Sequence, residues 1–188
     1  MSSLASHEKL TVLEVARHVL TAAVERRECP QHFPGTEFMQ RTAGAFVTLR
    51  RRRQLRGCIG QLSSGDSLIQ VIVHCAKAAA LEDPRFEPVR LEELFEIEIE
   101  VSVLSPLFEI APDLIEIGRH GLVVSRGWQR GVLLPQVAAE YRWHAERFLE
   151  ETCAKAGLER DAWRYPGIRM EGFTAEVFSE SEFRLQRL

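Results

Sequence analysis

Hydrophobic residues recur at helical spacing in two long segments of the chain. Within residues 6–27 every third or fourth position is apolar, and Ser6 stands at the start as a candidate N-cap. The same period returns in residues 68–81, where Asp66 is a candidate cap. Pro84 follows the second segment, and proline disfavours helix at the residue before it. We therefore predict two amphipathic helices, each with one face against a core.

Other segments alternate between apolar and polar residues, as strands do. Residues 95–103 are the clearest case, and such alternation is typical of antiparallel sheets with one buried and one solvated face. Polar turns at 50–54 and 125–130 each separate two alternating segments and therefore predict hairpins. The predicted strands are residues 45–49, 55–62, 95–103, 121–124, 131–134 and 170–178.

Shorter helical segments complete the order of elements. A helical turn is expected at 91–94, a short helix from Pro135, and a longer one at 144–156 before Gly157, a favourable C′ residue. Helices and strands in this mixed order indicate the α+β class, with a mainly antiparallel sheet flanked by helices. No repeat or linker interrupts the chain, so we expect one compact domain over residues 6–180, in two sub-lobes.

Composition excludes several classes of protein. The net charge of −3 gives no general attraction to nucleic acids or anionic membranes. No apolar run approaches the length of a membrane span and no secretory signal is visible, so a cytoplasmic location is expected. The four cysteines are scattered and the six histidines dispersed, so neither a disulfide framework nor a metal site is expected. No glycine-rich phosphate loop or three-cysteine cluster is present, so no cofactor is expected.

The segment Leu55–Gly60, with the sequence LRGCIG, carries the candidate chemistry. Glycine within a strand marks a bulge or a close approach to the backbone, so Gly57 and Gly60 are candidates for making room for a substrate. Cys58 is a candidate nucleophile, because a nearby cation such as Arg56 favours the thiolate. A free cysteine in a strand can equally be an inert core residue, and both interpretations remain open.

Three further groups of residues are candidates for catalysis or binding. His74 and His120 are candidate bases for Cys58, although no motif places either one near it. Asp83 and Arg85 could bind a polar substrate or orient Cys58, or form only a surface ion pair at a helix end. The arginine run 50–53 could contact phosphates, but a short basic turn is more often solvated, so nucleic-acid binding is not expected.

Several separated motifs together resemble the AMMECR domain, whose prokaryotic members are called AmmeMemoRadiSam system protein A. The resemblance extends from the first helix to about Glu180. The segments that carry it are 55–60, 78–80, 83–86, 98–106, 121–123, 133–138 and 153–158. It implies a larger lobe built from both chain ends and a smaller central lobe.

The same resemblance suggests partners, because prokaryotic members are often encoded beside a Memo-like protein and a radical SAM protein. Two functions are therefore expected as alternatives. In the first, the chain is a thiol-dependent enzyme or substrate-handling subunit. Cys58 would be the nucleophile or a covalent carrier, Arg56 would lower its pKa and hold an anionic group, and backbone amides near Gly57 and Gly60 would stabilise developing charge. In the second, it is a non-catalytic adaptor that docks onto one of those two partners.

Overall fold

The computed structural model describes residues 3–30, 32–62 and 65–183. The chain divides into two units, Met1–Leu104 together with Glu176–Leu188, and Ser105–Ala175. Helices and antiparallel strands make up the fold, which confirms the predicted α+β class. No helix within the described residues is long and apolar enough to cross a membrane.

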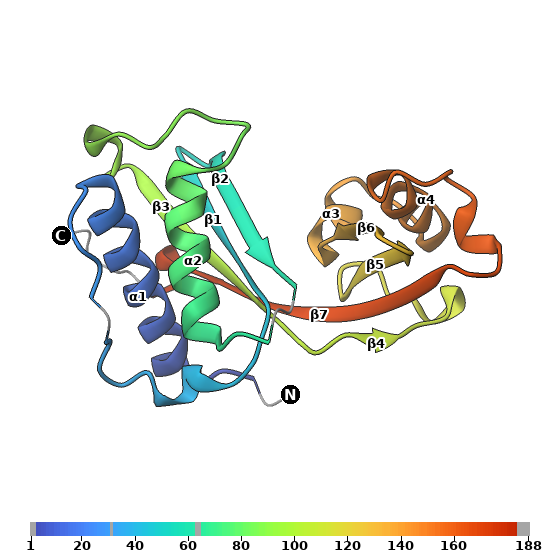
Figure 1. The fold of residues 1–188 in the computed structure, drawn as a ribbon, viewed down its shortest axis with the longest axis horizontal. Coiled ribbons are helices and arrows are strands. Elements are labelled where there is room, and N and C mark those ends of the chain that lie inside the picture. The colour runs from blue at the N-terminus through green and yellow to red at the C-terminus, as the bar shows by residue number, and fades with distance from the viewer. Residues whose placement is uncertain (1–2, 31, 63–64, 184–188) are drawn as a thin grey trace. The chain divides into compact units, whose positions relative to one another are not determined.

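In the first unit two helices lie against one face of an antiparallel sheet (Figure 1). The helices are α1 (Ser6–Val24) and α2 (Leu68–Leu81), and the strands, in spatial order, are β2 (Gln54–Gln61), β1 (Ala45–Arg51) and β3 (Ile97–Leu104). β7 (Arg169–Ser179) follows β3 in this order, whereas β2 has a neighbour on one side only among the strands of the described residues. β2 is therefore an edge strand, and half of its backbone groups point away from the sheet.

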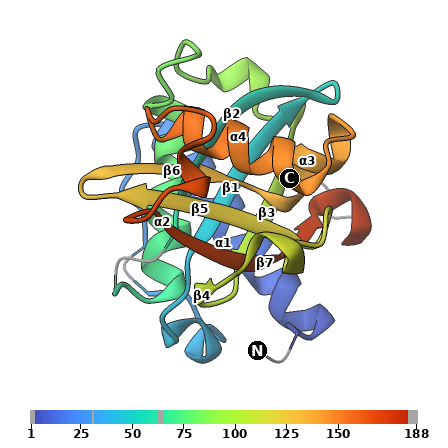
Figure 2. The same cartoon turned by 90° about the vertical axis from the view of Figure 1, so that its right-hand side faces the viewer.

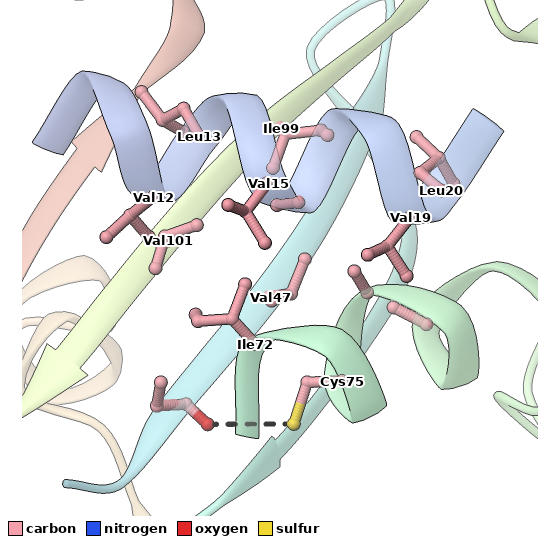
Figure 3. Packing of buried hydrophobic residues seen from close by; sticks show 14 of the residues in the cluster. Val12, Leu13, Val15, Val19, Leu20, Val47, Ile72, Cys75, Ile99 and Val101 are labelled. Atoms are coloured by element: carbon pink, nitrogen blue, oxygen red, sulfur yellow. Dashed lines mark hydrogen bonds between the residues drawn. The ribbon is translucent and has the colours of Figure 1, made fainter. Parts of the chain in front are cut away.

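The core of this unit fills the space between the helices and the sheet. Figure 3 shows Val15 of α1 and Ile72 of α2 directed at Val47 of β1. Val47 is fully buried, and its partners in register are Ile59 on one side and Val101 on the other. Because side chains alternate across a strand, the residues next to Val47 point to the opposite, more polar face of the sheet.

A buried carboxylate joins the C-terminal part of the chain to this core. Glu180 accepts hydrogen bonds from Nε of Arg17 at 2.8 Å and from the backbone N–H of Ile99 at 2.8 Å. The guanidinium of Arg17 also donates to the backbone carbonyl of Ile97 at 2.7 Å. α1, β3 and the segment after β7 are thus held by one charged cluster.

The second unit consists of strands covered by two helices (Figure 2). A hairpin is formed by β5 (His120–Arg126) and β6 (Gln129–Leu133), and β5 also pairs with β7 (Arg169–Ser179). The short strand β4 (Phe108–Glu109) pairs with β7 as well. The helices α3 (Pro135–Glu140) and α4 (Ala145–Lys155) follow the hairpin, and the buried side chains of α4 pack against it.

Most helices and strands were predicted, but several boundaries were wrong. α1 ends at Val24, three residues before the predicted end, because residues 25–27 are all polar. Its N-cap is Ala5 instead of Ser6, and Glu8 accepts the Ala5 backbone N–H at 2.8 Å. The N-cap of α2 is Ser67 instead of Asp66, and its N–H donates to the side chain of Gln70 at 2.9 Å.

The end of β1 and the start of β3 also differ from the prediction. The first difference comes from the length of the hairpin turn and the second from an exposed side chain. The first turn is reduced to Arg52 and Arg53, whose φ angles of 53° and 67° close a tight hairpin, so that Arg50 and Arg51 lie in β1. β3 begins at Ile97 instead of Phe95, and the side chain of Phe95 is 63% exposed.

The turn of this hairpin is exposed, as the sequence favoured, but arginines in and before it are also ion-paired. Arg51 and Arg52 both donate from Nε to a carboxylate oxygen of Glu96, each at 2.9 Å. Arg50 lies 3.5 Å from Glu100 on the neighbouring strand. Glu100 of β3 therefore pairs with an arginine of β1, and Glu96, just before β3, pairs with the hairpin, which offsets the repulsion between like charges along this segment.

Glu93 is the most buried carboxylate of this network. Arg56 binds it through both Nε and Nη2, each at 2.9 Å, and Arg51 adds a contact of 3.1 Å. The hydrogen bonds from Arg56 lower the pKa of Glu93 from its ordinary 4.5 to about 2, and the backbone N–H of Arg90 contributes in the same direction. Glu93 thus connects the β1–β2 hairpin to the segment before β3.

Replacing Glu93 by Gln is expected to lower the free energy of unfolding at pH 7 by about 2 kcal/mol, because two arginines lose their shared acceptor. A carboxyl whose pKa is lowered by folding contributes fully above its ordinary pKa and loses that contribution as the pH falls toward the folded value. The difference between wild type and Glu93→Gln should therefore shrink between pH 5 and pH 2 in urea titrations.

Glu98→Gln is the matched control, since Glu98 lies on β3 without an ion pair among the described residues. It should change stability little. A pH dependence of Glu93→Gln identical to that of wild type would show that the ion pairs add no stability.

Candidate functional site

Cys58 lies on β2, and its side chain is on the face of the sheet turned away from α1 and α2. Its partner in register is Thr48 of β1, and the next partner across, on β3, is Glu100. The Thr48 hydroxyl donates a hydrogen bond to the Cys58 sulfur at 3.3 Å. Cys58 is partly exposed, whereas Cys75 and Cys153 are fully buried. The Cys58 side chain is therefore not part of the core between the sheet and the helices.

The backbone of Cys58 is held from outside the sheet by Asp83 and Arg85. Asp83, whose side chain is 2% exposed, accepts the Cys58 N–H at 2.8 Å. Arg85 donates from Nη2 to the Cys58 carbonyl at 3.1 Å. Because β2 is an edge strand, these two groups have no strand to pair with, and the Asp83–Arg85 pair takes the place of one. The segments 55–60 and 83–86 thus meet at the backbone of one residue, Cys58.

Asp83 and Arg85 also bind each other tightly. The guanidinium donates from Nε at 2.9 Å and from Nη2 at 2.7 Å to the two carboxylate oxygens. Hydrogen bonding by Arg85 lowers the pKa of Asp83 from 3.8 to about 2, and the backbone N–H of Cys58 contributes in the same direction. Asp83 is thus an anion at any physiological pH, fixed between a cation and a strand.

Arg85 is the cation bound to Cys58, because its Nη2 donates to the Cys58 carbonyl oxygen at 3.1 Å. The pKa of Arg85 is raised first by its hydrogen bond to Asp83 and also by charge attraction to the Cys58 side chain. The sequence suggested Arg56 for this role. The guanidinium of Arg56 instead binds Glu93 and the carbonyl oxygen of Glu87, the latter at 2.9 Å. The pairing of β1 with β2 shifts by one residue at Arg56, which leaves it without a partner in register.

The space beside the Cα atoms of Gly57 and Gly60 is filled by neighbouring atoms. A Cβ atom on Gly57 would lie 2.1 Å from the backbone oxygen of Ala79, so α2 packs directly against the strand. A Cβ atom on Gly60 would lie 2.1 Å from the ring of Phe46, which covers this residue from β1. Neither glycine leaves open space for a substrate beside its Cα atom, and both serve close packing.

The histidines suggested as bases do not join Cys58. His74 is an exposed residue of α2, on the opposite side of the sheet from the sulfur. His120 belongs to the second unit, where its Nδ1 accepts the backbone N–H of Glu116 at 3.1 Å. Within the described residues no group of three or more His, Cys, Asp or Glu side chains is arranged to hold a metal ion.

Sequence reasoning missed Thr48 as a neighbour of the sulfur. Neither its residue type nor its position before the arginine run distinguishes it. The length of the hairpin was the available signal, because a two-residue turn together with the one-residue shift places Thr48 opposite Cys58.

The two glycines predict different costs for the same substitution. Gly57→Ala should destabilise the protein by about 3 kcal/mol, because the obstructing atom belongs to the backbone of a packed helix. Gly60→Ala should cost less, since the ring of Phe46 can rotate away. Thermal unfolding of both variants tests this order, and a larger loss for Gly60→Ala would contradict the packing described.

Several known proteins are similar to this chain over most of its length. The family model AMMECR1 matches residues 13–178. A protein of Methanothermobacter thermautotrophicus is 42% identical over 187 residues, covering 94% of this chain and 96% of the relative. One from Thermofilum pendens is 39% identical over 203 residues, covering 96% of this chain and 93% of the relative.

A solved structure has the same fold. The crystal structure of the uncharacterized protein PH0010 from Pyrococcus horikoshii matches with a TM-score of 0.84 at 37% sequence identity. The match covers 89% of each chain. The family model and the relatives both extend over most of the sequence, including the segments that meet at Cys58, and this chain therefore belongs to the AMMECR1 family.

Proposed function

We propose that the chain is a thiol-dependent enzyme, or the substrate-handling subunit of one, that acts through Cys58. The observation that carries this proposal is the hydrogen bond from the Thr48 hydroxyl to a partly exposed sulfur. The hydroxyl orients the sulfur, and the Arg85 guanidinium bound to the Cys58 carbonyl lies beside the same residue, so the thiol has the polar neighbours that nucleophilic cysteines have. In the covalent step the sulfur bonds to an electrophilic carbon of the substrate, the bond from that carbon to a leaving group breaks with its electron pair, and the thiol proton goes to solvent or to the departing group.

The site supports a narrower set of roles than the sequence suggested. The N–H of Cys58 is occupied by Asp83, so it is not free to stabilise a developing oxyanion. The arrangement of Thr48, Cys58 and Arg85 supplies a held thiol and a cation, without a histidine base. This combination suits a covalent carrier or a nucleophile toward an already activated substrate.

Cys58 should be alkylated by iodoacetamide faster than Cys29, which is also partly exposed and whose thiol pKa is raised by burial. Thr48→Val should lower the alkylation rate of Cys58 by roughly fivefold, which corresponds to the loss of one hydrogen bond. Thr48→Ser keeps the hydroxyl and should retain the wild-type rate. Peptide mass spectrometry of the folded protein at pH 7.5 gives each rate separately.

Cys75 provides the internal reference for an inert thiol. It is fully buried, and burial raises its pKa to about 12, so it should react only on unfolding. Labelling of Cys58 as slow as that of Cys75 would refute a thiol-dependent function.

A second candidate function, an adaptor that docks onto a Memo-like or radical SAM protein, is favoured by one other residue. Trp128 at the tip of the β5–β6 hairpin is 96% exposed, between the exposed residues Arg126 and Arg130. Neither arginine has an ion pair among the described residues. Tryptophan and arginine are the residue types most enriched among energetically dominant interface contacts.

Trp128→Ala should weaken binding to the purified partner protein at least tenfold, as loss of a dominant contact does. Tyr141→Ala is the control, because Tyr141 is an aromatic residue of the same unit that is 66% exposed. Isothermal titration with each candidate partner measures the affinity. Equal affinities of wild type and Trp128→Ala, or no binding of either partner, would exclude this docking mode.

A further inference from the structure

Arg85 is held at one edge and open at the other. Its Nε and Nη2 atoms bind Asp83 and the Cys58 carbonyl, whereas Nη1 has no hydrogen-bond partner in the part of the chain that the structure describes. The side chain of Arg85 is 54% exposed, while that of Asp83 behind it is 2% exposed. The pair is neutral as a whole, but a molecule approaching from solvent meets its positive end first.

This positive end lies beside the nucleophile. The Nη2 atom of Arg85 lies 3.1 Å from the carbonyl oxygen of Cys58, which places the guanidinium beside the residue that carries the sulfur. Attraction to the Cys58 side chain also contributes to the raised pKa of Arg85. The ring of Phe86 supports it, 5.5 Å from the guanidinium carbon. An arginine anchored on one edge loses little further conformational freedom when a ligand binds its other edge.

The charged groups near Arg85 limit how much negative charge a bound anion can carry. Glu100 lies in the same row across the strands as Cys58, although Arg50 is 3.5 Å from its carboxylate. The positive end of Arg85 is already shared with Asp83, so it can balance at most one further negative charge. A dianion such as a phosphate monoester would also be repelled by Glu100.

We propose that Cys58 acts on electrophiles that carry a carboxylate next to the reacting carbon, and that Arg85 binds this carboxylate through Nη1. The inference rests on the proposed thiol-dependent function and adds the class of substrate. It assigns anion recognition to Arg85, at the end of the segment after α2, instead of to Arg56.

Iodoacetate and iodoacetamide test this directly, because they differ in charge at nearly equal size. In both reactions a sulfur–carbon bond forms, the carbon–iodine bond breaks, iodide leaves, and the thiol proton goes to solvent. The measured quantity is the ratio of the iodoacetate rate to the iodoacetamide rate, at Cys58 and at Cys29 of the same folded protein. Attraction by one unit charge at a few ångströms in water should raise this ratio at Cys58 by about threefold or more.

Arg85→Met should abolish the excess at Cys58, whereas Arg53→Gln should leave it unchanged. Arg53 is an exposed arginine in the turn of the β1–β2 hairpin that carries Cys58, so its loss removes one positive charge without changing the Asp83 contacts. Should Arg85→Met fail to fold, the wild type decides: the excess should fall as NaCl is raised from 10 mM to 1 M, since screening weakens an exposed charge.

The outcomes separate the two proposals. Equal ratios at Cys58 and Cys29, or an excess that survives both Arg85→Met and high salt, overturn the carboxylate assignment while a fast iodoacetamide reaction keeps the thiol function. Inertness of Cys58 toward both reagents overturns the thiol function and the carboxylate assignment with it.

Discussion

The unpaired edge of β2 is the constraint around which the candidate site is built. A strand at the edge of a sheet exposes N–H and carbonyl groups that must be bound or solvated. Asp83 and Arg85 bind both of these groups on one residue, Cys58. The same pair that closes the edge therefore fixes the peptide that carries the sulfur and positions a cation beside it.

Close packing makes this arrangement possible. Gly57 allows the backbone of α2 to approach β2, and the chain that leaves α2 then runs past the outer edge of the strand. Pro84 helps to end the helix there, so that Asp83 and Arg85 lie beside the strand instead of continuing along the helix axis. A bulkier residue at 57 would displace the helix and with it both charged side chains.

The two proposed functions use different parts of the molecule. The thiol function depends on Thr48, Cys58 and Arg85 in the first unit, whereas docking through Trp128 depends on a hairpin tip in the second. They are therefore compatible: a substrate-handling subunit that carries a covalent intermediate also needs a surface that brings it to the enzyme that consumes it.

Local patterns in the sequence determined the helices, the alternating strands and the fold class. The period of hydrophobic positions depends only on which face of each element is buried, so the helix at 68–81 was predicted with its observed bounds and the strand at 95–103 with small errors at its ends. Cys58, Asp83 and Arg85 could also be chosen as candidate site residues, because their motifs stand out locally.

Tertiary structure decided which residues meet. Strand register placed Thr48 opposite Cys58, a shift at Arg56 turned that residue toward Glu93, and the edge position of β2 gave Asp83 and Arg85 a backbone to bind. None of these follows from residue type or spacing, because pairing depends on turn length and on packing between segments far apart in the chain.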